Sequence, residues 1–154
     1  MAIRALLDSN VVIAAVAEAH EHHQPSNALL GSASTGSLAV AAHSYSEAYS
    51  ILTRKADASP FKWPANEAIA ALESVAMRCP LVGLTHGQTF DAIRDFAADG
   101  GIGPRLYDKL IGEVAVHNGI PVIVTWNRAH FETLFPAVTI MTPSSFAAEG
   151  KTSG

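Results

Sequence analysis

The sequence predicts an α/β fold, with a central, mostly parallel sheet of four or five strands and helices on both of its faces. Two observations support this prediction. Short apolar runs alternate along the chain with longer segments whose apolar residues recur at helical spacing. The runs are apolar along their whole length, as expected for strands that are buried on both sides. Strands that alternate with helices form parallel sheets covered by those helices.

The strand candidates are short and apolar, and the fourth is rich in β-branched residues, which favour strands. In chain order they span residues 3–7, 38–42, 81–84, 121–125 and 138–141. The helix candidates are longer, and a proline or glycine stands at several of their ends. In chain order they span residues 10–19, a segment beginning near Pro25, and residues 44–55, 65–78, 89–98 and 104–117.

The length of 154 residues fits one ordinary domain with a substantial core. Because there is no internal repeat and no visible boundary, residues 1–149 are expected to form a single domain. Residues 57–64 are predicted to be a loop within it, and residues 150–154 a flexible C-terminal tail.

The composition excludes several classes of protein. The net charge of −4 argues against a surface coated in basic residues, so any contact with nucleic acid must come from a local patch. The single cysteine, Cys79, excludes an internal disulfide and fits a reducing compartment. No apolar run approaches the roughly 20 residues that span a bilayer, and the N-terminus lacks a signal-peptide pattern. We therefore expect a cytoplasmic protein without contact to a membrane.

Three acids and one amide lie near the predicted carboxyl edge of the sheet. Asp8 follows the first strand, and Glu47 lies in the first turn of the helix after the second strand. Asp108 lies on the helix before the fourth strand, and Asn127 follows that strand. Ligands gather at this edge in open parallel sheets. Hard oxygen ligands suit Mg²⁺ or Mn²⁺, which can position and activate water for attack on a phosphodiester.

Each of these residues also has a purely structural interpretation. Asp8 is a good helix N-cap, and Ser44 with Glu47 fits a capping box, which would compete for the same carboxylate. Asn127 fits an ordinary turn. Asp108 lies on an otherwise apolar flank of its helix, where a partly buried acid needs a partner. Their joint occurrence favours the functional interpretation.

Four stretches that contain these residues resemble the PIN-domain ribonucleases and, among them, the VapC-type toxins of bacterial toxin–antitoxin modules. In order, they are residues 6–13, 44–48, 106–111, and 124–127 with His130 and Phe131 after them. The resemblance covers nearly the whole chain. It implies a PIN-like α/β/α sandwich, cleavage of RNA that depends on Mg²⁺ (with Mn²⁺ as a substitute), restraint of growth, and neutralisation by a small antitoxin protein.

The resemblance also implies the roles of individual residues. The acidic quartet of the family corresponds to Asp8, Glu47 and Asp108, with Asn127 where an aspartate is common. Asp8 and Asp108 would hold the metal, and Glu47 would reach it partly through water. Self-association is implied as well, and we expect a homodimer. The high apolar fraction of 49% fits surface covered by a partner, although a large core would also explain it.

Several further residues invite a functional interpretation. Basic side chains near the acids are candidate RNA contacts that could form a local rim; they are Arg105, Lys109, Arg128 and His130. Isolated surface charges are the commoner explanation for the first three, and packing or helix capping for His130. Trp63 and Trp126 could stack on unpaired bases or pack in the core. His20, His22 and His23 suggest a transition-metal site, but a solvated loop is favoured because a fourth ligand is missing. A non-catalytic RNA-binding or scaffold domain with a weakened metal site is the main alternative function, because of Asn127.

Overall fold

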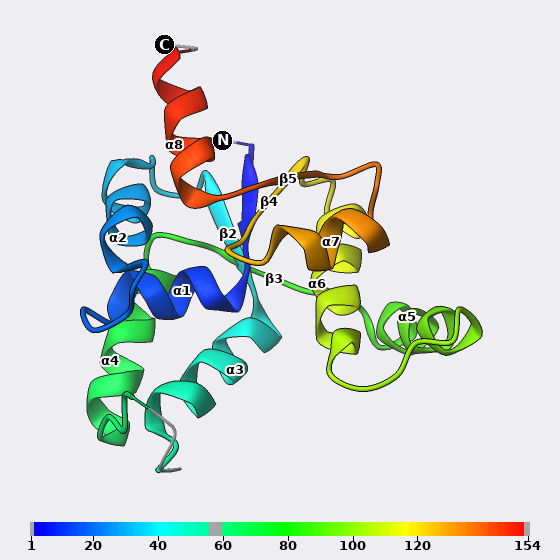
Figure 1. Cartoon of the computed structure of the whole chain (residues 1–154), viewed down its shortest axis with the longest axis horizontal. Coiled ribbons are helices and arrows are strands. Elements are labelled where there is room, and N and C mark those ends of the chain that lie inside the picture. The colour runs from blue at the N-terminus through cyan, green and yellow to red at the C-terminus, as the bar shows by residue number, and fades with distance from the viewer. Residues whose placement is uncertain (1, 56–59, 153–154) are drawn as a thin grey trace.

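The computed structural model describes residues 2–55 and 60–152, in which each strand is followed by one or two helices (Figure 1). The strands are β1 (Ala5–Leu7), β2 (Leu38–Ala41), β3 (Leu81–Val82), β4 (Val122–Val124) and β5 (Thr139–Met141). The helices are α1 (Ser9–Val16), α2 (His23–Ser32), α3 (Ala42–Thr53), α4 (Ala65–Ala76), α5 (His86–Ala98), α6 (Arg105–His117), α7 (Arg128–Leu134) and α8 (Pro143–Thr152).

The five described strands form one parallel sheet in the order β3-β2-β1-β4-β5. The predicted α/β class and parallel sheet are confirmed. From β1 the chain moves outward to β2 and β3 on one side, and then crosses to β4 and β5 on the other. Leu7 of β1 is paired with Val124 of β4, so both central strands end side by side. The crevice beyond such strand ends, where the strand order reverses, is the usual ligand site of an open parallel sheet.

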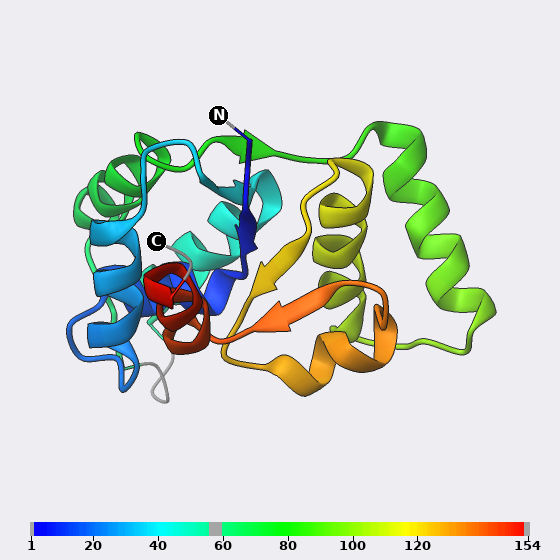
Figure 2. The same ribbon diagram turned by 90° about the horizontal axis from the view of Figure 1, so that it is seen from above.

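Successive side chains of each strand point to opposite faces, and each face has its own core. Leu7 and Val40 belong to a core with residues of α1 to α4 and α8. Leu6 and Ala39 belong to a second core with residues of α6 and α7, of which Phe131 is fully buried. Figure 2 shows these two groups of helices on either side of the sheet, with α5 lying outside α6. The strands are therefore apolar throughout because both of their faces are covered.

Two predicted helix bounds differ from the structure by three residues. Helix α1 ends at Val16, because Ala17 adopts an extended backbone (φ −99°, ψ 104°). Helix α5 begins at His86, where Thr85 and Gln88 form a capping box: the Gln88 N–H donates to Thr85 Oγ1, and the Thr85 N–H to Gln88 Oε1. The Thr-x-x-Gln spacing of a capping box is visible in the sequence at this position. The other bounds of predicted elements lie within two residues of those observed.

Helices α7 and α8 were not predicted. Helix α7 has seven residues, too few for a clear period. Helix α8 begins with Pro143, and the Thr142 hydroxyl accepts a hydrogen bond from the Ser145 N–H. Its backbone continues to Thr152, so the first residues of the expected tail are helical.

Residues 56–59, which include part of the expected loop, and residues 153–154, the end of the expected tail, lie outside the described residues. None of the helices in the described part of the chain is long and apolar enough to span a membrane.

Candidate active site

A pocket of about 330 Å³ opens at the carboxyl ends of β1 and β4. The sequence candidates Asp8, Glu47, Asp108 and Asn127 all line it, although they come from four different parts of the chain. The other lining residues come from α1, α3, the start of α6 and α7; they are Ser9, Asn10, Ile13, Ile51, Pro104, Arg105 and His130. The fold thus brings the predicted acidic residues to one cavity.

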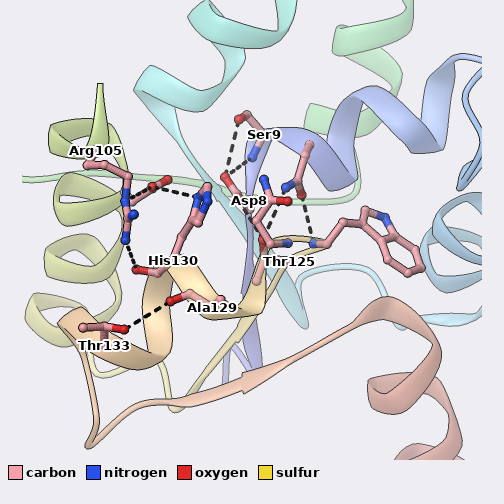
Figure 3. A network of polar contacts seen from close by, with 11 residues as sticks. Asp8, Ser9, Arg105, Thr125, Ala129, His130 and Thr133 are labelled. Carbon is pink, nitrogen blue, oxygen red and sulfur yellow. Dashed lines mark hydrogen bonds and ion pairs between the residues drawn. The ribbon is translucent and has the colours of Figure 1, made fainter. Parts of the chain in front are cut away.

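Asp8 is held by uncharged donors on one side of the pocket, which we call the neutral wall. Asp8, Ser9 and Asn10 line the pocket there, and the fully buried Thr125 is hydrogen-bonded to Asp8 and Asn10. Asp8 Oδ1 accepts from the Ser9 N–H at 2.7 Å and from the Ser9 hydroxyl at 3.4 Å, and Asp8 Oδ2 accepts from the Thr125 hydroxyl at 2.8 Å (Figure 3). Burial raises the pKa of Asp8 to about 6; the Thr125 hydrogen bond opposes this, and the nearby Asp108 adds to it. Asp8 therefore both caps α1 and lines the pocket.

Thr125 is a site residue that sequence reasoning missed. It is fully buried at the end of β4, as Asp8 is at the end of β1. Its oxygen accepts from Asn10 Nδ2 at 3.3 Å and from the Asn127 N–H at 2.9 Å, while its hydroxyl donates to Asp8. A polar residue that ends an apolar strand is the signal that could have identified it, because the same signal identified Asp8.

Glu47 reaches the pocket from α3, and the capping-box interpretation is wrong. Helix α3 begins at Ala42 without a side-chain cap, so Ser44 lies inside the helix. Within the described structure, neither the Ser44 hydroxyl nor Glu47 Oε1 has a hydrogen-bond partner, and both atoms are buried. Burial raises the pKa of Glu47 to about 7, with further contributions from the charges of Asp8 and Asp108. A buried carboxylate oxygen without a donor is costly, and a cation would relieve that cost.

Asp108 lies on the opposite side, which we call the charged wall: Arg105, Asp108 and His130. Asp108 Oδ2 lies 3.4 Å from Arg105 Nε and 3.3 Å from His130 Nδ1, and the Arg105 guanidinium also donates to the His130 carbonyl at 3.1 Å (Figure 3). Burial raises the pKa of Asp108, and both basic groups oppose that rise. Asp108 therefore has the partners that its apolar helix flank requires.

The four candidate RNA contacts do not all converge. Arg105 and His130 line the pocket. Lys109 is largely buried, 2.8 Å from Glu113, with its ammonium over the Phe135 ring. Arg128 lies 2.8 Å from Glu132 on the surface of α7. Neither Lys109 nor Arg128 lines the pocket, so the local basic rim consists of Arg105 and His130.

The side chains of this pocket offer the type of ligand atom that a hard divalent cation prefers. These atoms are carboxylate oxygens whose pKa values are raised partly by one another, and Glu47 Oε1 is buried without a donor. Within the described residues, however, no three His, Cys, Asp or Glu side chains already surround one point as ligands.

Comparisons with known proteins agree with this fold. A family model described as the PIN domain matches residues 5–134. Among solved structures, VapC20 from Mycobacterium tuberculosis, a Sarcin-Ricin loop cleaving toxin, has a TM-score of 0.61 at 15% identity over 77% of this chain and 86% of that chain. VapBC2 from Rickettsia felis, bound to a DNA fragment from its promoter, has a TM-score of 0.61 at 16% identity over 92% of this chain and 98% of that chain. FitAcB from Neisseria gonorrhoeae has a TM-score of 0.61 at 19% identity over 91% and 98%.

No curated protein sequence matches this chain. At the identities above, the solved structures establish a shared fold and nothing further. The family model covers most of the chain, from β1 through α7. This chain therefore belongs to the PIN-domain family.

Proposed function

We propose that this chain is a metal-dependent endoribonuclease that acts in the cytoplasm as the toxin of a toxin–antitoxin module and restrains growth by hydrolysing RNA. One observation carries the proposal: Asp8, Glu47 and Asp108 converge on one pocket, where burial and mutual repulsion raise the pKa values of Asp8 and Glu47. Membership of the PIN-domain family supports it, as does the shared fold with VapC20, a Sarcin-Ricin loop cleaving toxin.

In the proposed mechanism, Asp8 and Asp108 hold Mg²⁺ or Mn²⁺, and Glu47 reaches it partly through water. When bound, the ion would position and activate water and offset charge on the phosphate. The protein contributes the positions of the donors. Ser9 and Thr125 fix the Asp8 carboxylate, and Arg105 with His130 fixes Asp108. Arg105 and His130 also give the pocket the positive charge that an RNA phosphate requires.

The proposed partners are RNA, a small antitoxin and a second copy of the chain. Ile69 and Leu81 line a second, mostly apolar pocket between α3 and α4 and are 47% and 57% exposed. Met77, which directly follows α4, is 82% exposed. Apolar groups at such exposure favour burial against a partner. Light scattering of the purified chain should detect a dimer. If the gene next to this one encodes a short protein, co-expression of the two should recover a complex. A monomer at high concentration with no recovered partner would contradict this part of the proposal.

The activity is tested by RNA cleavage with Asp8→Asn, Glu47→Gln and Asp108→Asn. Each is expected to lose about 100-fold or more in rate, while circular dichroism confirms the fold. Asp95→Asn is the matched control, because Asp95 is exposed on α5 and lies outside the pocket. EDTA should abolish cleavage, and Mg²⁺ or Mn²⁺ should restore it. Full cleavage in EDTA, or by Asp8→Asn, contradicts the proposal.

The alternative is a non-catalytic RNA-binding or scaffold domain. Two observations favour it. Asn127 lines the pocket where an aspartate is common in the family. In the described residues, no three metal-binding side chains already surround one point. The same assay separates the two functions. A chain that binds RNA but does not cut it with either metal, before or after Asn127→Asp, has the alternative function.

A further inference from the structure

A row of aromatic rings, which has no role in the proposed chemistry, lies beside the pocket that Asp8, Glu47 and Asp108 line; we call this pocket the acid pocket. It consists of Phe61, His20, His22 and Trp126. The His22 and Trp126 rings are stacked at a centroid distance of 4.0 Å with an angle of 11°. His20 lies 5.7 Å from His22 in a tilted arrangement, and its ring is parallel to Phe61 at 6.4 Å. All four are partly exposed, so one side of the row forms part of the surface, while Phe61 and Trp126 also pack against the core.

The row is connected to the pocket through Trp126. This residue stands between Thr125, which fixes Asp8, and Asn127, which lines the pocket. Its backbone N–H donates to Asn10 Oδ1 at 3.3 Å, and Asn10 in turn donates to Thr125. Trp126, at one end of the row, is thus connected by hydrogen bonds to the neutral wall.

Trp126 is also fixed in orientation. Its indole N–H donates at 2.9 Å to the hydroxyl of Ser26, which is fully buried on α2. The His22 N–H donates to His20 Nδ1 at 3.0 Å, which fixes these two residues of the turn relative to each other. A surface whose rings are already held in place loses little conformational entropy when a flat ligand stacks on it.

The charges around the row favour a base over a phosphate. Glu18 and Glu21 are exposed in the same turn, and Glu21 Oε1 lies 3.6 Å from His22 Nε2. These acids disfavour phosphate oxygens at this place, whereas the basic groups Arg105 and His130 lie in the pocket. Flat aromatic and histidine rings are the usual stacking partners of unpaired bases in RNA.

We propose that His22 and Trp126 form a stacking platform for one unpaired base of the RNA substrate, next to the phosphodiester in the acid pocket. The inference rests on the proposed function and adds the two residues that would hold a base beside the reacting phosphodiester. Stacking is tolerant of sequence because every base has a flat face, so the platform selects unpaired RNA without selecting one base.

The test measures binding without cleavage. Trp63→Phe leaves Trp126 as the only tryptophan, and EDTA prevents metal-dependent hydrolysis. Titration with single-stranded oligouridine RNA should quench Trp126 fluorescence with saturation, and a duplex RNA of the same length should not. In this background His22→Ala should weaken binding about tenfold, whereas His22→Phe should stay within about twofold because it retains a flat ring. His86→Ala, an exposed histidine on α5, is the control and should bind unchanged.

Anisotropy of a labelled RNA separates the possible failures. If RNA binds but Trp126 fluorescence does not change, or if His22→Ala and His22→Phe bind equally, the platform is refuted while the nuclease proposal stands. If His22→Ala lowers the melting temperature without lowering RNA affinity, the row serves only to pin the turn, and the inference is wrong. If neither strand form binds by either signal, the inference fails, and the cleavage assay with Mg²⁺ or Mn²⁺ decides the proposed function separately.

Discussion

The two walls of the pocket hold their acids in different ways. On the neutral wall, Asp8 is 4% exposed, and hydroxyl and backbone donors satisfy its carboxylate. On the charged wall, the side chains of Arg105, Asp108 and His130 are 48%, 18% and 43% exposed, and ion pairs hold the acid. Neutral donors in a buried site keep their strength because water does not compete, whereas exposed ion pairs are screened. The neutral wall should therefore contribute more to stability, and the charged wall should respond more to salt.

The largest effect is expected from Thr125→Val. The substitution retains the shape of the side chain but removes the hydroxyl, which leaves the buried Asp8 Oδ2 and the Asn127 N–H without their partner. We expect the free energy of unfolding at pH 8 to fall by roughly 4 kcal/mol, measured by urea denaturation in EDTA. Thr125→Ser retains the hydroxyl and is expected to lose much less. Equal losses in both variants would mean that packing, not the hydrogen bonds, explains the effect.

The next effect concerns pH. Asp8 has a pKa of about 6 in the folded chain, against an ordinary value of 3.8. Between these values the folded state binds more protons than the unfolded state, so stability falls as pH rises. The penalty is absent below pH 3.8 and complete above pH 6, where it amounts to about 3 kcal/mol. The raised pKa of Glu47, about 7, acts in the same direction.

Denaturation of the metal-free chain between pH 4 and pH 8 measures this loss of stability. Asp8→Asn should remove about half of the slope below pH 6 and leave the part due to Glu47, which runs from about pH 4.5 to about pH 7. The control is again Asp95→Asn, which should keep the full slope. A metal-free chain whose stability rises between pH 4 and pH 6 would contradict the raised pKa.

A smaller effect is expected for Asn127, which lies between the walls: its N–H donates to Thr125, and the residue lines the pocket. An amide carries no charge, so the free protein should bind at most one Mg²⁺ or Mn²⁺ tightly. Asn127→Asp adds a charge and should tighten Mn²⁺ binding about tenfold in calorimetric titration, with cleavage equal or faster. Two tight sites in the unaltered chain, or no tightening in the variant, would show that Asn127 lies outside the metal site.

The smallest effect is expected on the charged wall. Arg105→Gln and His130→Gln should each change the free energy of unfolding by less than about 1 kcal/mol, because their ion pairs are half exposed. The change should shrink further in high salt. Arg94→Gln, which removes an exposed ion pair on α5, is the comparison. A loss as large as that of Thr125→Val would show that the two walls contribute equally.

The sequence alone determined the architecture and the identity of the acids. Burial on both faces makes β1, β2 and β4 apolar throughout, so they could be predicted from composition. Asp8 interrupts that apolar pattern at a strand end, and Asp108 interrupts an apolar helix flank. Polar residues at positions where the local pattern demands apolar ones are visible without a structure.

The tertiary structure alone decided which interactions each acid makes. The Ser44–Glu47 spacing fits a cap, but β2 leads directly into α3 at Ala42, so Glu47 reaches the pocket instead. The bond from Thr125 to Asp8 joins residues 117 positions apart. Lys109 and Arg105 look equivalent in the sequence, yet their places on α6 send one to Glu113 and the other to the pocket. Local sequence patterns show which polar residues interrupt an apolar segment. The partners of these residues depend on the order of the strands and the rotation of the helices, and packing of the whole core determines both.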